Sequence, residues 1–161
     1  MTRRLLLMRH AKSTPAKPGM SDHERPLEEK GVDDASAAGK KLHKHGYEPD
    51  IVLCSDSTRT LETWAQIKER FDKDTPFIKS AKLYEASVSA YRNMIISKGE
   101  NAKTILLIGH NPTIEQFVAT FSKERTEVKP ADTVVLEVKA SDWEAALDMA
   151  GSLKLAEIIR C

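Results

Sequence analysis

The chain has 161 residues, of which 25 are Lys or Arg and 24 are Asp or Glu, so its formal net charge is +1. This balance excludes a nucleic-acid-binding protein that relies on a strong overall positive charge. With 40% hydrophobic and 30% charged residues, the composition is that of an ordinary globular protein. We expect a single domain over residues 1–161.

No segment has the apolar length of a signal peptide or of a membrane span. The first apolar run ends at Arg9 and His10, and charged residues interrupt every later run well short of the ~18 residues that a span requires. The two cysteines, Cys54 and Cys161, have neither the spacing of a disulfide framework nor that of metal ligands. We therefore expect a cytoplasmic protein that does not interact with a membrane.

Three short apolar runs predict buried strands, at Leu5–Met8, Ile51–Cys54 and Ile105–Ile108. None of them alternates between apolar and polar residues. Continuous apolar runs of this length are typical of strands that are covered by helices on both faces, which is the usual situation in a parallel sheet. These runs therefore form the predicted centre of the molecule.

Helical spacing of apolar residues predicts four helices between and after these runs. The first covers Glu28 to His45, the second is marked by apolar positions from Leu61 to Phe71, and the third covers about Ser89 to Ser97. The fourth is predicted to have Asn111 as its N-cap and Pro112 as its first helical residue.

The last part of the chain predicts two more strands, Thr133–Val138 and Leu153–Ile159, joined by a short helix near Asp142 to Leu147. We expect this tail to pair antiparallel at a sheet edge. The segment Ser13–Met20 is predicted to be a loop near a functional site. The predicted fold is thus a single-domain α/β sandwich of three layers, with a mostly parallel sheet flanked by helices.

Polar residues follow each of the three buried runs. Arg9 and His10 follow the first, the segment from Ser55 to Arg59 follows the second, and His110 follows the third after a glycine. Ligands of open α/β sheets bind at the carboxyl ends of the strands, so we expect these residues to converge. Two arginines and two histidines beside a helix N-terminus favour an anion, and phosphate is the natural candidate.

The sequence contains no Walker loop and no GxGxxG motif, so side chains would have to hold the phosphate. We expect Arg9, Arg59 and a cationic His110 to neutralise the phosphoryl oxygens, which leaves His10 as a nucleophile that forms a phosphohistidine intermediate. This chemistry requires no cofactor and no metal. A metal site formed by Asp22 and His23 with the two histidines is the weaker alternative, because no ligand spacing supports it.

The segment from Leu5 to Ser13, with Arg9-His10-Ala11 at its centre, resembles the Arg-His-Gly signature of the histidine phosphatase (phosphoglycerate mutase-like) superfamily, with Ala11 in place of glycine. The resemblance spans nearly the whole chain and is strongest to the small SixA-type phosphohistidine phosphatases. It implies a phosphoglycerate mutase-like fold.

Three further segments carry this resemblance. Arg25-Pro26-Leu27 and Gly31 match the lead into the first helix of these proteins, and Gly109-His110-Asn111-Pro112 matches the second-histidine motif. The segment Cys54–Thr63 resembles a third family motif and keeps Arg59 in register, but it departs from that motif at three positions, which are Asp56, Thr60 and Glu62.

The resemblance implies that His10 is the nucleophile and that Arg9, Arg59 and His110 bind the phosphate. An acidic proton donor is expected near Glu85, which is the weakest of these assignments. Three more residues are expected to contact the phosphate, or a sulfate that replaces it, and they are Ser13, Arg25 and Asn111.

The expected substrate is a phosphohistidine on a protein, because the short interval between Arg59 and His110 leaves little room for the caps with which larger relatives enclose small molecules. Two alternatives remain open. One is a small-molecule phosphomonoesterase of the same superfamily, and the other is a non-catalytic module that binds phosphorylated partners. A mutase is the least favoured, since nothing visible would retain a second phosphate.

Each histidine or arginine taken alone is more easily explained as a structural residue, and only their combination favours a site.

Overall fold

The computed structural model describes all residues 1–161 and contains one sheet of six strands in the order β3-β2-β4-β1-β5-β6. The pairs β1–β4, β2–β4 and β2–β3 are parallel, whereas β5 runs antiparallel to both β1 and β6. The strands are β1 (Thr2–Arg9), β2 (Ile51–Ser55), β3 (Phe77–Ser80), β4 (Thr104–Gly109), β5 (Thr133–Lys139) and β6 (Lys154–Ile159).

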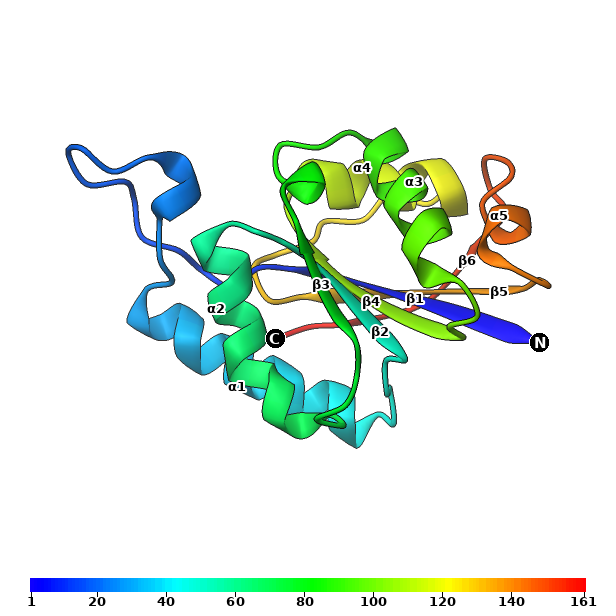
Figure 1. Cartoon of the computed structure of the whole chain (residues 1–161), viewed down its shortest axis with the longest axis horizontal. Helices are drawn as coiled ribbons and strands as arrows, with labels where there is room; N and C mark the ends of the chain where they lie inside the picture. Colours follow the sequence, from blue (N-terminus) through cyan, green and yellow to red (C-terminus); the bar gives the residue numbers. More distant parts are fainter.

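Helices cover both faces of this sheet, as Figure 1 shows. One face carries α1 and α2, and the other carries α3, α4 and the short α5. The helices are α1 (Glu29–Lys44), α2 (Thr58–Ile67), α3 (Val88–Gly99), α4 (Thr113–Ser122) and α5 (Trp143–Ala146). The prediction of a three-layer α/β fold with a mostly parallel sheet is confirmed, and so is the antiparallel pairing of the tail at one edge.

The central strands are buried on both faces, which explains their continuous apolar sequences. Leu5 and Leu7 of β1 belong to the core under α3 and α4, whereas Leu6 and Met8 belong to the core under α1 and α2. Side chains alternate between the two faces of a strand, so a strand that has a core on each side must be apolar at every position. This double burial fixes the central strands in the middle of the molecule.

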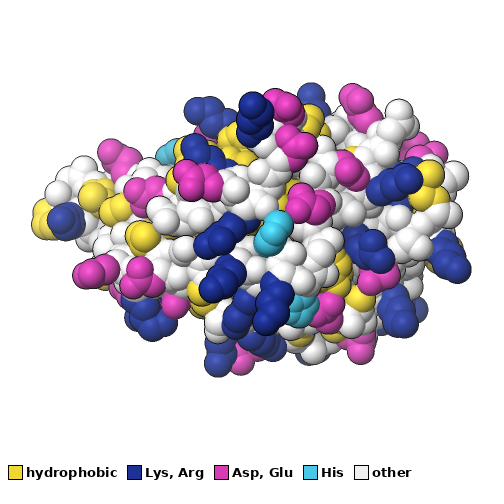
Figure 2. Space-filling view, turned by 90° about the horizontal axis from the view of Figure 1, so that it is seen from below, with side chains coloured by type: hydrophobic (Ala, Val, Ile, Leu, Met, Phe, Trp, Pro, Cys, Tyr) yellow, Lys and Arg dark blue, Asp and Glu magenta, His cyan; other side chains and the backbone are white.

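The outer side of α1 is polar. Exposed Lys40, Lys41 and Lys44 lie near the end of this helix. Figure 2 shows Lys and Arg side chains gathered on the face of the molecule that it presents. Cationic side chains at this end are favourable because the carbonyl groups of the last turn carry partial negative charge. The helix ends at Lys44, and Gly46 follows with a positive φ of 78°, a conformation that suits glycine after a helix.

Two local features differ from the sequence-based predictions. Strand β3 was not predicted, because its four residues are only partly buried and have no apolar pattern of their own; pairing with β2 is what makes the segment a strand. Helix α4 begins at Thr113, so that Pro112 and not Asn111 is the N-cap residue. The Asn111 side chain still accepts a hydrogen bond from the backbone N–H of Glu115, at 3.3 Å.

None of the helices has both the length and the hydropathy to cross a lipid bilayer.

The loop between β1 and α1 extends from one end of the molecule (blue in Figure 1) and contains a short 3₁₀ turn, Asp22–Glu24. The end of this loop approaches its beginning closely, since the backbone N–H of Glu28 donates to the carbonyl of Lys12 at 3.0 Å.

Gly31 makes this close approach possible, and we predict that Gly31→Ala destabilises the protein. A Cβ atom at this position would lie 2.0 Å from the carbonyl oxygen of Lys12, which is a backbone atom that no rotamer change can move. Alanine in a helix is otherwise about 1 kcal/mol more favourable than glycine. We therefore expect a loss of roughly 1–3 kcal/mol in the free energy of unfolding, measured in urea.

The matched control is Lys40→Ala on the exposed side of the same helix, which should change the free energy of unfolding by less than about 0.5 kcal/mol. A Gly31→Ala variant as stable as the wild type would contradict the proposed packing.

Candidate active site

The carboxyl ends of β2, β4 and β1, which are neighbours in the sheet, bring the predicted site residues together. Arg9 is the last residue of β1 and lies opposite Gly109, the last residue of β4, so that His10 and His110 leave the sheet side by side. Their ring centroids are 5.3 Å apart. Arg59 lies in the first turn of α2, just after the end of β2, and so joins the two histidines from a third strand.

These side chains line a pocket of about 330 Å³. Seven of the eight predicted site residues lie there, which are Arg9, His10, Ser13, Arg25, Arg59, His110 and Asn111. The eighth, Glu85, lines a neighbouring pocket of about 420 Å³. The two pockets share Arg59, His110 and Asn111 as a common wall. The expected convergence therefore occurs, with Glu85 placed beside the cationic pocket.

The ring of His10 is held in one orientation and one protonation state. Its Nδ1 atom lies 2.7 Å from the carbonyl oxygen of Ala11, which can only accept, so Nδ1 carries the proton and Nε2 has a free lone pair. Arg59 donates from Nε to this Nε2 at 3.3 Å. Burial lowers the pKa of His10 to about 4, and the nearby Arg59 and Arg9 charges act in the same direction. At neutral pH this imidazole is uncharged and can act as a nucleophile.

His110 is also neutral in the protein by itself. Burial, together with the neighbouring His10 and Arg59, lowers its pKa to about 3. Its Nε2 lies 2.8 Å from Ser55 Oγ, and its Nδ1 is buried without a partner. The expectation of a cationic His110 is therefore wrong for the protein alone, because close packing against His10 and Arg59 disfavours a further positive charge.

The Arg9 side chain is supported by the segment 127–132. Its Nη1 donates to the carbonyl of Val128 at 3.0 Å, and its Nε is buried without a partner. Asn111 Nδ2 donates to the same carbonyl at 2.9 Å. Glu115 accepts from the backbone N–H of Val128 at 2.8 Å and so holds this segment from the side of α4.

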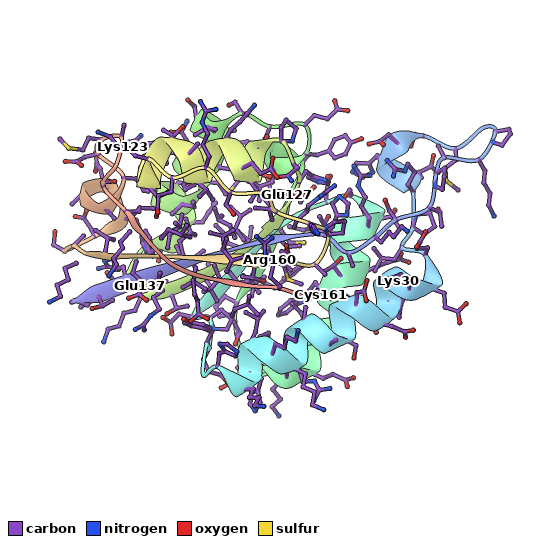
Figure 3. The ribbon with its side chains drawn as sticks, turned by 180° about the vertical axis from the view of Figure 1, so that it is seen from behind. Lys30, Lys123, Glu127, Glu137, Arg160 and Cys161 are labelled. Atoms are coloured by element: carbon purple, nitrogen blue, oxygen red, sulfur yellow. The ribbon has the colours of Figure 1, made fainter.

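The end of the chain holds the same segment from the other side. Arg160 donates to the carbonyl of Glu127 and to the buried carboxylate of Asp132, at 2.7 and 2.6 Å. Figure 3 labels Arg160 and Glu127 at this contact. Burial lowers the pKa of Arg9, while Glu115 and Asp132 counteract this effect through their negative charge. The two carboxylates thus stabilise both the position and the charge of Arg9.

Arg59 and Arg25 share one carboxylate that the sequence analysis did not assign to the phosphate site. Asp22 accepts from Arg59 Nη2 at 3.1 Å and from Arg25 Nη1 at 2.7 Å, and its backbone carbonyl accepts from Arg59 Nη1 at 2.8 Å. Arg25 Nη2 also donates to Ser13 Oγ at 2.8 Å. Glu62, which follows Arg59 on α2, accepts instead from the backbone N–H of Leu27 at 2.8 Å.

Tyr84 is a second residue that sequence reasoning missed. Its hydroxyl donates to Asp22, and its ring meets the rings of His110 and His23 edge-on. His23 is only partly exposed, and its Nε2 lies 2.8 Å from Oδ1 of Asp56. Nothing in the local sequence marks these residues, because they reach the site through a loop and through the segment after β3.

Glu85 is exposed and has a positive φ of 49°, and no hydrogen bond fixes its carboxylate. It lies at the open side of the larger pocket, next to Tyr84. In the whole chain, no group of three or more His, Cys, Asp or Glu side chains is arranged to hold a metal ion.

The two buried histidines predict a specific loss of stability in mild acid. The pKa values of His10 and His110 in the folded chain are about 4 and 3, against 6.5 for a free imidazole. Between pH 7 and pH 5, the two imidazoles therefore bind protons in the unfolded chain but stay neutral in the folded chain. The free energy of unfolding should fall by about 2 kcal/mol for each histidine between pH 7 and pH 5. Chemical denaturation at both pH values measures this loss.

His10→Asn should remove roughly half of the pH dependence in this range, because one of the two buried imidazoles is gone. His43→Asn, at an exposed position on α1, serves as the control and should leave the slope as it is. A wild-type protein of equal stability at both pH values would show that the imidazoles are not buried in neutral form.

Comparison with known proteins places this site in a family. Residues 5–102 match the family model of the histidine phosphatase superfamily (branch 1). An uncharacterized chloroplastic protein of Arabidopsis thaliana is 31% identical over 160 residues, which cover 94% of this chain and 73% of the relative. An uncharacterized protein of Mycobacterium tuberculosis is 39% identical over 106 residues, which cover 66% of this chain and 64% of the relative.

Solved structures agree with this assignment. A candidate phosphohistidine phosphatase SixA from Nakamurella multipartitia is 28% identical, with a TM-score of 0.84 over 98% of this chain and 95% of that one. A protein histidine phosphatase SixA solved with tungstate shares the fold at 19% identity, with a TM-score of 0.79 over 98% of this chain and 96% of that one. With the family match and the Arabidopsis relative, these findings show that the chain belongs to the histidine phosphatase superfamily, branch 1.

Proposed function

We propose that this protein is a metal-independent phosphatase that transfers a phosphoryl group to Nε2 of His10 and then to water. The observation that carries this proposal is the His10 ring itself. It is buried and neutral, its Nδ1–H is bound to the Ala11 carbonyl, and its Nε2 lone pair faces Arg59 inside a pocket lined by three arginines. A nucleophile fixed in this way needs no deprotonation before it attacks phosphorus.

In the first step, the Nε2 lone pair of His10 forms a bond to phosphorus. The bond from phosphorus to the leaving atom breaks, and its electron pair stays with that atom, which takes up a proton. In the second step, the oxygen of water forms a bond to phosphorus and the water proton passes to the carboxylate of Glu85, the proposed donor of the first step. The bond from phosphorus to Nε2 breaks, its electron pair returns to His10, and inorganic phosphate leaves. Arg9 and Arg59 stabilise the negative charge of the phosphoryl oxygens in both steps, with N–H groups of His110 and Asn111 as further donors.

The arginine side chains supply the positive charge that a metal ion provides in many phosphoryl-transfer enzymes, so the proposed mechanism is complete without one. A SixA protein histidine phosphatase of the same fold was solved as a complex with tungstate, an oxyanion of phosphate-like shape, which supports binding of such an anion by this protein. We expect inorganic phosphate or sulfate to bind in the 330 Å³ pocket.

Protein-borne phosphohistidine is the substrate that the site favours. Imidazole leaves more readily than an alcohol, because its conjugate acid has a reference pKa of about 6.5 and it needs less help from a proton donor. The only carboxylates at the open side are the exposed Glu85 and the ionised Asp22, whose pKa is held well below its usual range by Tyr84, Arg25 and Arg59. Glu85 is therefore the proposed proton donor, although an imidazole leaving group depends only weakly on a proton from it.

A small-molecule phosphomonoesterase is the second candidate. The observation that favours it is the position of Glu85 beside the larger pocket, where a proton donor for an alcohol would be needed.

Loss of the nucleophile should abolish turnover. We predict that wild-type protein releases phosphate from a phosphohistidine protein in the presence of excess EDTA, and that His10→Ala lowers the rate at least roughly a thousandfold. Mass spectrometry of the quenched wild-type reaction should detect a phosphorylated His10 peptide. His43→Ala, outside the site, should keep the wild-type rate.

Two results would contradict this mechanism. Activity that EDTA removes would exclude the metal-independent route, and phosphate binding without turnover would favour a non-catalytic binding module.

The role of Glu85 can be separated from that of the phosphate pocket. Glu85→Gln should slow hydrolysis of an alkyl phosphate by about a hundredfold, because an alkoxide needs a proton to leave. The same variant should slow hydrolysis of phosphohistidine by less than about fivefold, because imidazole leaves more easily. Comparison of kcat for the two substrates tests this, with the exposed Glu24→Gln as the control. Equal losses on both substrates would argue against Glu85 as the donor.

A further inference from the structure

Asp22 occupies a position that the proposed reaction does not explain. Its two carboxylate oxygens pair with Arg25 and Arg59, the cations on one side of the phosphate pocket. Arg59 uses three of its five N–H groups for contacts within the protein, one to His10 and two to Asp22. The carboxylate thus competes with any phosphoryl group for the same guanidinium.

The Asp22 charge is permanent across the neutral pH range. Hydrogen bonds from Tyr84, Arg25 and Arg59 hold the pKa of this carboxyl well below its usual value, and the same contact, together with burial, raises the pKa of Tyr84 to about 12. Asp22 is therefore a fixed negative charge and Tyr84 a neutral phenol. Neither group changes its protonation state between pH 5 and pH 9.

The two adjoining pockets differ in charge. The 330 Å³ pocket is lined by Arg9, Arg25, Lys12 and Arg59 and by no carboxylate. The 420 Å³ pocket is lined by Asp22 and Glu85, and its one cation is Arg59, which it shares with the first pocket. A phosphoryl group bound at His10 lies in the cationic pocket, and the carboxylates of Asp22 and Glu85 lie beyond the wall that the two pockets share.

We propose that Asp22 is a specificity-determining residue, which favours phosphoryl groups attached to a basic nitrogen and disfavours phosphate esters whose leaving group is anionic. The proposal rests on the phosphatase function proposed above. The second ring nitrogen of a phosphorylated imidazole can carry a proton and interact with a carboxylate at short range. A leaving group that bears a carboxylate or a second phosphate is repelled by the same charge.

The test compares Asp22→Asn with the wild type on two small substrates, N-phosphoimidazole and 3-phosphoglycerate. Asparagine keeps an oxygen that can accept from Arg59, so the substitution removes the charge and preserves the shape. We expect kcat/KM to fall about threefold for N-phosphoimidazole and to rise about threefold for 3-phosphoglycerate, chiefly through KM, so that the preference changes by roughly tenfold. Asp22→Ala should shift the preference in the same direction.

The matched control is Glu24→Gln. Glu24 lies on the same 3₁₀ turn and carries the same charge, but its carboxylate bonds only to Ser21 and points to no arginine. This variant should leave both values within about twofold of the wild type. If Glu24→Gln changed the preference between the two substrates as much as Asp22→Asn does, the general charge of the loop, and not Asp22, would be responsible.

Opposite effects on two substrates cannot arise from partial unfolding, which would lower both in proportion. Equal losses on both substrates in Asp22→Asn would overturn the proposal and make Asp22 a support for Arg59 alone. If the wild type hydrolyses neither small substrate, the proposed function is judged separately on the phosphohistidine protein, and the inference is still tested by phosphate binding measured calorimetrically. Asp22→Asn should then bind inorganic phosphate about threefold more tightly, and unchanged or weaker binding would refute the role of Asp22 as a competing charge.

Discussion

The hydrogen bond from His10 Nδ1 to the Ala11 carbonyl is the interaction on which the rest of the site depends. It places the proton on one nitrogen and leaves the other free, and the burial of the ring keeps it uncharged. The geometry exists because β1 ends at this point in the middle of the sheet, with β4 on one side and β5 on the other. The double core beneath the strand therefore determines where the reactive atom lies.

Arg59 is buried and Arg9 and Arg25 are half-buried beside His10, at a cost that the surrounding carboxylates offset. Glu115 and Asp132 hold the segment whose Val128 carbonyl accepts from Arg9, and Asp22 pairs with Arg59 and Arg25. Unpaired buried charges are strongly unfavourable, so an anion-binding pocket needs such partners before the anion arrives. Each of these carboxylates lies behind or beside the pocket, which leaves the pocket itself cationic.

In the proposed reaction, this distribution of charge separates the two halves of the substrate. The pocket proposed for the phosphoryl group is lined by guanidinium and imidazole groups, and the adjoining pocket is lined by Asp22, Glu85 and the Tyr84 ring. A chemical preference can thus arise at a small open site without an enclosing cap. The short segment from β3 through α3 to β4 contributes Tyr84 and Glu85 to this outer wall without covering it.

The sequence by itself determined the central strands and the main helices, because these depend on local patterns, and together with the family resemblance it predicted seven residues that line the 330 Å³ pocket. A continuous apolar run specifies a strand buried on both faces, and a residue directly after such a strand is placed at the carboxyl edge of the sheet. Only the tertiary structure decided the rest. Strand β3 exists through its pairing with β2, and the Asp22–Arg59 pair joins residues 37 positions apart. The neutral state of His110 results from its burial and, to a smaller extent, from the neighbouring His10. Contacts of this kind and the pKa values that burial imposes depend on which segments meet in space, and no local pattern in the chain encodes that.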